Sequence, residues 1–163
     1  DDSRDWIVPG KDAVANVTWI TQLDGYGVKY DYKTRKGPFI CPQEPIGVGW
    51  GADLFSYSHY GINSRLSGCK TMGADRKGWR KKSLVFKSTL TILVADNFRK
   101  TTWDVDYMSL DRVAWRHGVG GGEANILYIG GNVNNLRFNP YNSNTWRLMD
   151  GFKYGDSSSW IQP

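Results

Sequence analysis

The stretch from Asp111 to Val133, DRVAWRHGVGGGEANILYIGGNV, constrains the fold of this chain more than any other. A strand-like segment over 112–115 ends at Arg116-His117, and a glycine-rich loop follows over 118–122. An apolar run, Ala124 to Ile129, comes next. Short apolar runs separated by glycine turns predict strands rather than helices.

The same stretch contains the strongest hairpin signal in the chain. Ile126–Ile129 and Val133–Phe138 are two short strand-like runs separated by Gly130, Gly131 and Asn132. Tight turns between antiparallel strands need residues that tolerate positive φ, which glycine does at no steric cost. We therefore predict a β-hairpin and expect Gly130 and Gly131 to supply the positive φ angles.

Length and composition predict one domain over residues 1–163. Hydrophobic residues make up 40% of the 163 residues and aromatic residues 14%, enough to build a core that offsets chain entropy. No apolar run reaches the roughly 18–20 residues that cross a bilayer, and no signal-peptide pattern is visible.

The remaining segments predict an α+β fold with long loops. Residues 13–24 have apolar positions at helical spacing, before Gly25 and Gly27, and predict a short helix. The further expectations are a short strand at 28–32, loops at 33–54, a strand within 56–68, a basic loop at 73–82, a strand at 91–96, a polar loop at 97–110, a strand at 112–115 and an irregular C-terminal tail.

The charge pattern is mildly basic. The net charge is +5, and its densest cluster is Arg76, Lys77, Arg80, Lys81 and Lys82 around Trp79. We interpret the cluster as a solvated loop, with contact to an anionic membrane surface as an alternative. No nucleic-acid fold motif accompanies it, so no nucleic-acid partner is expected.

Cys41 and Cys69 leave two alternatives open. They could form one disulfide, as in an oxidising envelope or extracellular space, or remain independent buried thiols. Their spacing matches no redox or zinc motif.

Several short motifs, in order, resemble a large family of bacterial pseudopilin-like proteins with a prepilin-type cleavage site and an H-x9-DG motif. Each match alone is unspecific, but together they span most of the chain. They are Asp1–Pro9, Trp19–Leu23 with Tyr26, Phe39-Ile40-Cys41-Pro42, Ser58–Leu66, Thr91–Asp96 and the segment that begins at Arg116-His117.

The resemblance implies a type IV pilin-like globular head, in which an antiparallel β-sheet packs on a long N-terminal helix. That helix would precede Asp1, carry a prepilin peptidase site and anchor the subunit in the bacterial inner membrane. The implied function is a non-catalytic structural subunit of a type II secretion pseudopilus or type IV pilus-like filament. Its partners would be other pilin-like subunits on the periplasmic or cell-surface side of the envelope.

The chain departs from the family motif at its end. The family's Asp-Gly is Gly130-Gly131 here, and the histidine after it is Asn132. We therefore interpret the motif as structural. Arg116 and His117 are expected to cap a strand end, with the His117 ring donating to the glycine loop and Arg116 pairing with Asp96.

An enzyme is not expected from these residues. Asp96 and Asp111 are conceivable partners for His117 as a general base, but no nucleophile motif stands near it in the sequence.

Two binding hypotheses remain beside the structural one. Asp104, Asp106 and Asp111 could hold calcium in a loop, although their spacing matches no full EF-hand-type loop. Tryptophans in loop-like segments, Trp50, Trp79 and Trp103 among them, could stack on sugars, so the alternative function is a secreted carbohydrate-binding module with a glycan partner.

Overall fold

The computed structural model describes residues 5–12, 17–24, 37–49, 51–68, 81–85, 87–105 and 113–137. The predictions for the strand at 28–32, for most of the basic loop at 73–82 and for the C-terminal tail lie outside these residues.

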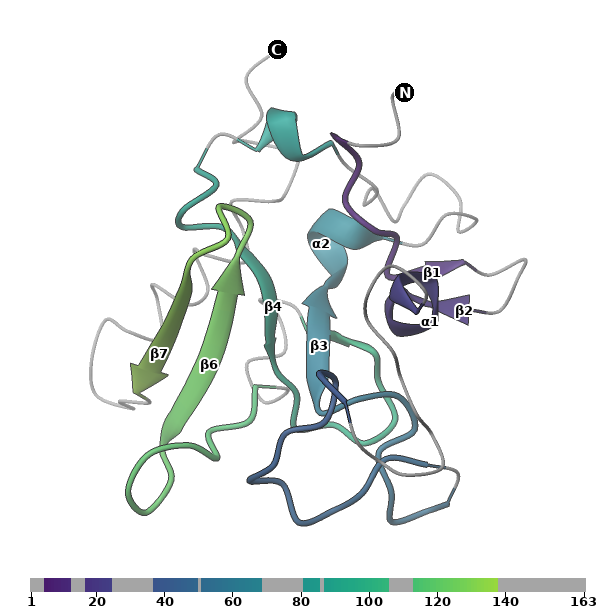
Figure 1. Ribbon diagram of the computed structural model, residues 1–163, viewed down its shortest axis with the longest axis vertical. Coiled ribbons are helices and arrows are strands. Elements are labelled where there is room, and N and C mark those ends of the chain that lie inside the picture. The colour runs from purple at the N-terminus through teal and green to yellow at the C-terminus, as the bar shows by residue number, and fades with distance from the viewer. Residues whose placement is uncertain are drawn as a thin grey trace.

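The fold is α+β, as predicted, and is built around one five-stranded sheet (Figure 1). The strand order is β5-β3-β4-β6-β7, and every neighbouring pair is antiparallel except β3 and β5, which are parallel. The sheet strands are β3 (Tyr60–Asn63), β4 (Ile92–Asp96), β5 (Asp104–Val105), β6 (Glu123–Tyr128) and β7 (Val133–Arg137).

Short elements lie beside this sheet. A two-stranded ribbon precedes the first helix, and a second helix directly follows β3. These elements are β1 (Lys11–Asp12), β2 (Val17–Thr18), α1 (Trp19–Leu23), α2 (Ser64–Ser67) and the 3-10 turn η2 (Lys82–Leu84).

The predicted hairpin is confirmed, but its turn uses one glycine where two were expected. β6 and β7 pair from Glu123↔Arg137 to Leu127↔Val133. Gly131 has φ +89°, whereas Gly130 does not have positive φ. The N–H of Gly131 donates to the Tyr128 carbonyl at 2.9 Å, which closes a four-residue turn. A turn followed by one left-handed residue needs positive φ only at that last position.

Three other expectations need correction. The helix expected over 13–24 begins only at Trp19, because Val17 and Thr18 pair with β1. The polar segment 97–110 contributes β5 to the sheet edge. Of the strand expected over 112–115, the described residues 113–115 form only a single bridge, between Val113 and Asn97. The strands expected within 56–68 and 91–96 are confirmed as β3 and β4.

The two faces of the sheet pack differently. Along β6, buried and half-buried residues alternate, as a strand of period two requires. Ala124, Ile126 and Tyr128 point into one core cluster with Ile92 and Val113. The opposite face meets α1 and the 37–49 loop in a second cluster, which contains Trp19, Ile20, Phe39, Val48, Phe55 and Ile62.

Within the ranges that the structure describes, no helix has both the length and the apolar character to span a bilayer.

Candidate functional site

Three potentially reactive side chains from distant segments converge where β4 ends and β6 begins, at the lower edge of the sheet in Figure 1. The Cys41 Sγ lies 3.7 Å from the His117 Nε2. The same nitrogen lies 3.2 Å from the Asp96 Oδ2. The ligand atoms of all three residues fall within 4.8 Å of one another. We call this group the Cys-Asp-His cluster.

The sheet positions Asp96 and His117. Asp96 is the last residue of β4, and its Oδ2 accepts the backbone N–H of Asn125 at 2.6 Å. His117 forms a two-way backbone bridge with Glu123, at 2.9 and 3.0 Å, just before β6. Between these two residues the glycine loop reverses the chain, with positive φ at Gly118, Gly120, Gly121 and Gly122. The glycine-rich sequence therefore serves to bring His117 to the end of β4.

A second histidine holds the cysteine in place. The backbone N–H of Cys41 donates to the His59 Nδ1 at 2.8 Å, and the His59 Nε2 lies 2.8 Å from the Ile46 carbonyl. Because Nδ1 accepts a hydrogen bond, Nε2 must carry the ring proton and donate to the Ile46 carbonyl. Burial, followed by the nearby Arg116 charge, lowers the pKa of His59. The ring is therefore neutral and structural.

Burial controls the electrostatics of the cluster. Asp96 is fully buried, and this burial raises its pKa although Asn125, His117 and Arg116 all favour the charged form. Its second oxygen, Oδ1, is buried without a hydrogen-bond partner. Burial, then the proximity of Cys41 and Asp96, raises the pKa of Tyr60 to about 12. The Tyr60 hydroxyl thus stays protonated beside the thiol.

Arg116 does not pair with Asp96 as the sequence suggested. Its Nη1 lies 2.8 Å from the Glu44 Oε2, and its Nη2 donates to the Asn97 carbonyl. The guanidinium also lies over the Phe55 ring, 5.7 Å from its centroid. His117 occupies the position beside Asp96 because the carboxylate faces the start of β6, whereas Arg116 reaches toward the 37–49 loop.

The cluster also corrects the expectation that no nucleophile lies near His117. The Cys41 thiol is its neighbour, although the two residues are 76 positions apart in the chain. The sequence contained both parts of this signal, in the Phe39–Pro42 and Arg116-His117 motifs, but no local pattern joined them.

The geometry does not match a nucleophile–histidine–carboxylate relay. In such a relay, the nucleophile and the carboxylate contact opposite nitrogens of the imidazole. Here Cys41 and Asp96 both approach Nε2, and the thiol is only 1% exposed. The arrangement is better suited to sharing a cation or a proton among three converging atoms than to attacking a substrate.

The other predicted site residues do not come together in the described part of the chain. Cys41 is a free, buried thiol, which matches the independent-thiol alternative for this residue. Asp104 lies in β5, and Trp103 is half-buried and packs against the second core cluster. The residues Cys69, Trp50, Trp79, Asp106 and Asp111 lie outside the described residues.

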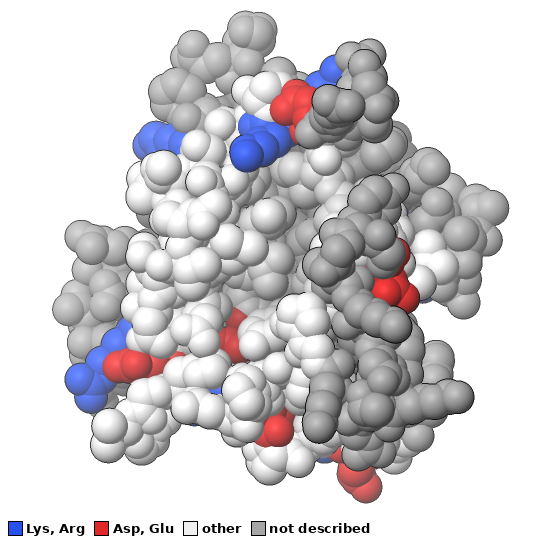
Figure 2. Space-filling model, in the orientation of Figure 1, with Lys and Arg blue, Asp and Glu red and all other residues white. Residues whose placement is uncertain are grey.

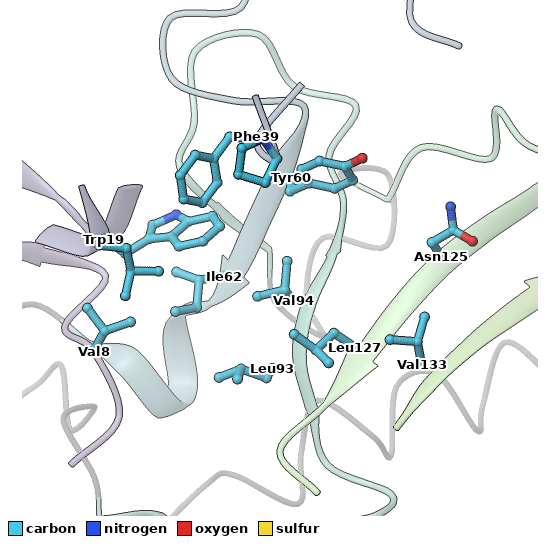
Figure 3. A pocket seen from close by; sticks show the side chains of 12 residues that line it. Val8, Trp19, Phe39, Tyr60, Ile62, Leu93, Val94, Asn125, Leu127 and Val133 are labelled. Carbon is cyan, nitrogen blue, oxygen red and sulfur yellow. The ribbon is translucent and has the colours of Figure 1, made fainter. Parts of the chain in front are cut away.

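A separate apolar groove of about 380 Å³ opens on the sheet face opposite the first core cluster (Figure 3). Its floor comes from β3, β4 and β6, and α1 and Phe39 form one wall. Asn125 is the single amide side chain in its lining, and Val133, 62% exposed, lies at its rim. The lining is Val8, Trp19, Leu23, Pro38, Phe39, Tyr60, Ile62, Leu93, Val94, Asn125, Leu127 and Val133.

Charged side chains are sparse over much of the described surface on the face seen in Figure 2. Lysine and arginine appear mainly at the top and the lower left of this view, acidic residues also appear on the right and low in the centre, and most other described atoms belong to uncharged residues. Most of the described surface in this view is therefore uncharged.

Comparison with known proteins identifies no relative of this chain. No family model, no curated protein and no solved structure matches it.

Proposed function

We propose that this chain is the globular head of a pilin-like filament subunit, in a type II secretion pseudopilus or a type IV pilus-like fibre. The role is structural and non-catalytic. The ordered series of short motifs supports this proposal, and the α+β architecture with an antiparallel four-stranded core is compatible with it.

The apolar groove is the observation that carries the proposal. A sheet face that is apolar and open needs a partner, because exposed apolar surface costs about 25 cal/mol per Å². In pilin-like heads, the partner is the C-terminal half of the long N-terminal helix. We assign the groove to an amphipathic helix that precedes Asp1 in the full-length protein.

The position of the N-terminal segment agrees with this occupant. Val8 lines the groove, so the chain already lies along its edge before it turns into β1. A helix presents apolar side chains at intervals of three and four residues, which is the kind of surface that this lining accepts. The upstream part of the same helix would anchor the subunit in the inner membrane before assembly.

The full-length reading frame provides the first test. Sequencing upstream of Asp1 should reveal a prepilin peptidase site followed by an apolar helix of about 20 residues, the length that crosses a bilayer. A cleavable signal peptide in that place would contradict the filament proposal and direct attention to the carbohydrate-binding alternative.

The groove itself is tested in the full-length protein by Leu127→Asp, with Val119→Asp as the matched control. Leu127 lines the groove, whereas Val119 is fully exposed in the glycine loop. We expect Leu127→Asp to abolish incorporation into filaments and Val119→Asp to leave it intact, with both heads folded by circular dichroism. Filaments assembled equally well by both variants would refute the assignment of the groove.

A further inference from the structure

We propose that Cys41, Asp96 and His117 form a binding site for one Zn²⁺ ion that clamps three separate segments of the head together. The inference does not depend on the filament proposal, because the cluster lies where β4 ends and β6 begins, whereas the apolar groove lies on a face of the sheet. Its evidence is the geometry, burial and chemistry of the Cys-Asp-His cluster.

Two of the three distances between the donor atoms are close to those of a tetrahedral zinc site, and the third, from Cys41 Sγ to the Asp96 carboxylate, lies within 4.8 Å. Zinc binds sulfur at about 2.3 Å, and nitrogen and oxygen at about 2.0–2.2 Å, so tetrahedral angles separate S from N by about 3.6 Å and N from O by about 3.4 Å. The corresponding distances here are 3.7 Å between Cys41 Sγ and His117 Nε2, and 3.2 Å between His117 Nε2 and Asp96 Oδ2. One ion can therefore contact all three donors after a small closure of the thiol toward the carboxylate.

One oxygen of the Asp96 carboxylate lacks a hydrogen-bond partner. The Asp96 Oδ1 is buried and accepts no hydrogen bond. Leaving such an oxygen unsatisfied is costly, and a carboxylate more so than a neutral group. A divalent cation bound at Oδ2 would offset the burial that disfavours the charge of the Asp96 carboxylate, and an ion shared by both oxygens would also satisfy Oδ1.

The donor set selects the type of metal. Thiolate and imidazole are ligands for zinc and similar transition metals, whereas calcium and magnesium require oxygen donors. The site therefore differs in kind from the calcium loop considered for Asp104, Asp106 and Asp111. Three protein ligands leave a fourth position, and the His117 side chain, 14% exposed, marks the side from which solvent can reach it.

Neighbouring groups hold the proposed ligands in place through hydrogen bonds. Asn125 donates to Asp96, and His59 fixes the backbone of Cys41. Arg116 is close to the cluster, but its charge is balanced by Glu44 at 2.8 Å. The Cys41 thiolate and the Asp96 carboxylate can thus together balance the charge of a divalent ion. Hydrogen-bond partners such as Asn125 and His59 orient the ligands in metal sites.

The consequence of binding is structural. Cys41 belongs to the 37–49 loop, Asp96 ends β4 and His117 precedes β6, so one ion would cross-link three segments that are far apart in sequence. Binding displaces the thiol proton to solvent, so affinity falls at low pH. Occupancy therefore stabilises the end of the sheet around the glycine loop.

The test uses purified chain, first stripped with a chelator under reducing conditions and then titrated with Zn²⁺ alone or with Co²⁺ alone. We expect one ion per chain, a thiolate-to-cobalt charge-transfer absorption, and a rise in the thermal-unfolding midpoint of at least about 5 °C with saturating Zn²⁺. Cys41→Ala should lose all three signals, and the matched control Cys69→Ala should keep them.

His117→Gln provides a second variant, because His117 is the most exposed member of the cluster and its replacement leaves Cys41 and Asp96 in place. It should reduce Zn²⁺ affinity at least tenfold while the metal-free chain keeps its circular dichroism spectrum. The proposal is overturned if the parent chain binds less than one Zn²⁺ at a hundredfold excess. It is equally overturned if Cys41→Ala binds Zn²⁺ as tightly as the parent chain does. If Cys41→Ala does not fold, the same criterion applies to His117→Gln.

Discussion

Replacing Asp96 tests how a side chain extends the pairing between β4 and β6. Backbone pairing aligns Ala95 with Ile126, and the next amide of β6, that of Asn125, donates to the Asp96 carboxylate at 2.6 Å. The carboxylate oxygen thus takes the place of a backbone acceptor at the end of the ladder. Asp96→Ala removes this acceptor, whereas Asp96→Asn keeps an oxygen in a side chain of the same shape.

The magnitude follows from the single hydrogen bond that distinguishes the two variants. A backbone N–H left without its partner costs about 1–3 kcal/mol, and the missing side-chain atoms in a fully buried position add a small void. We expect Asp96→Ala to be less stable than Asp96→Asn by about 2–3 kcal/mol. Neither variant ionises at this position, so this difference should not depend on pH.

The difference in stability between Asp96→Asn and the parent chain should change with pH, in a direction that the burial of Asp96 sets. Burial raises the folded-state pKa of Asp96 above its ordinary value of 3.8. A raised folded-state pKa stabilises the fold at pH values below the ordinary one, and this contribution is lost as the pH rises through the folded-state value. Asp96→Asn should therefore gain stability relative to the parent as the pH rises from 3.8 toward neutrality.

Equilibrium urea unfolding of the three proteins, in the presence of a chelator and at several pH values, measures both effects. A difference between the alanine and asparagine variants below about 0.5 kcal/mol would refute the role of the side-chain acceptor, because that is the size of an ordinary surface substitution. A parent chain that gains stability over asparagine with rising pH would refute the burial argument.

Two further predictions concern other parts of the fold. A Cβ at Gly10 would lie 2.1 Å from a ring carbon of Trp103, so Gly10→Ala should destabilise the fold by about 1–3 kcal/mol. Gly51→Ala, whose nearest contact would be an ordinary 3.6 Å, serves as the control, and equal thermal-unfolding midpoints for the two variants would contradict the packing argument. The folded-state pKa of Tyr60 is about 12, above its ordinary value of 10.0, because the fold favours the neutral hydroxyl. This preference contributes stability that is lost as the pH rises from 10.0 to about 12. Over that pH range, Tyr60→Phe should lose about 2–3 kcal/mol less stability than the parent chain, as measured by urea unfolding. An equal loss of stability in both proteins would contradict this prediction.

Local sequence patterns predicted the central strands well. β3, β4 and the β6–β7 hairpin follow from apolar runs and turn glycines that act over a few residues. The same reasoning failed where a partner elsewhere decided the outcome. Val17 and Thr18 carry a helical pattern but pair with β1, and Val113 finds only a one-residue bridge. Propensity is a weak prior wherever tertiary pairing competes with it.

The same division applies to the Cys-Asp-His cluster. The sequence by itself determined that Asp96 ends a buried strand, that His117 precedes a glycine loop and that Cys41 lies in a proline-rich loop. Only the tertiary structure decided that these residues meet, and that His117 rather than Arg116 faces Asp96. The physical reason is that side-chain periodicity and turn chemistry are encoded within a few residues. The proximity of Cys41 to His117 depends instead on which strands become neighbours, and that is set by burial of the whole chain.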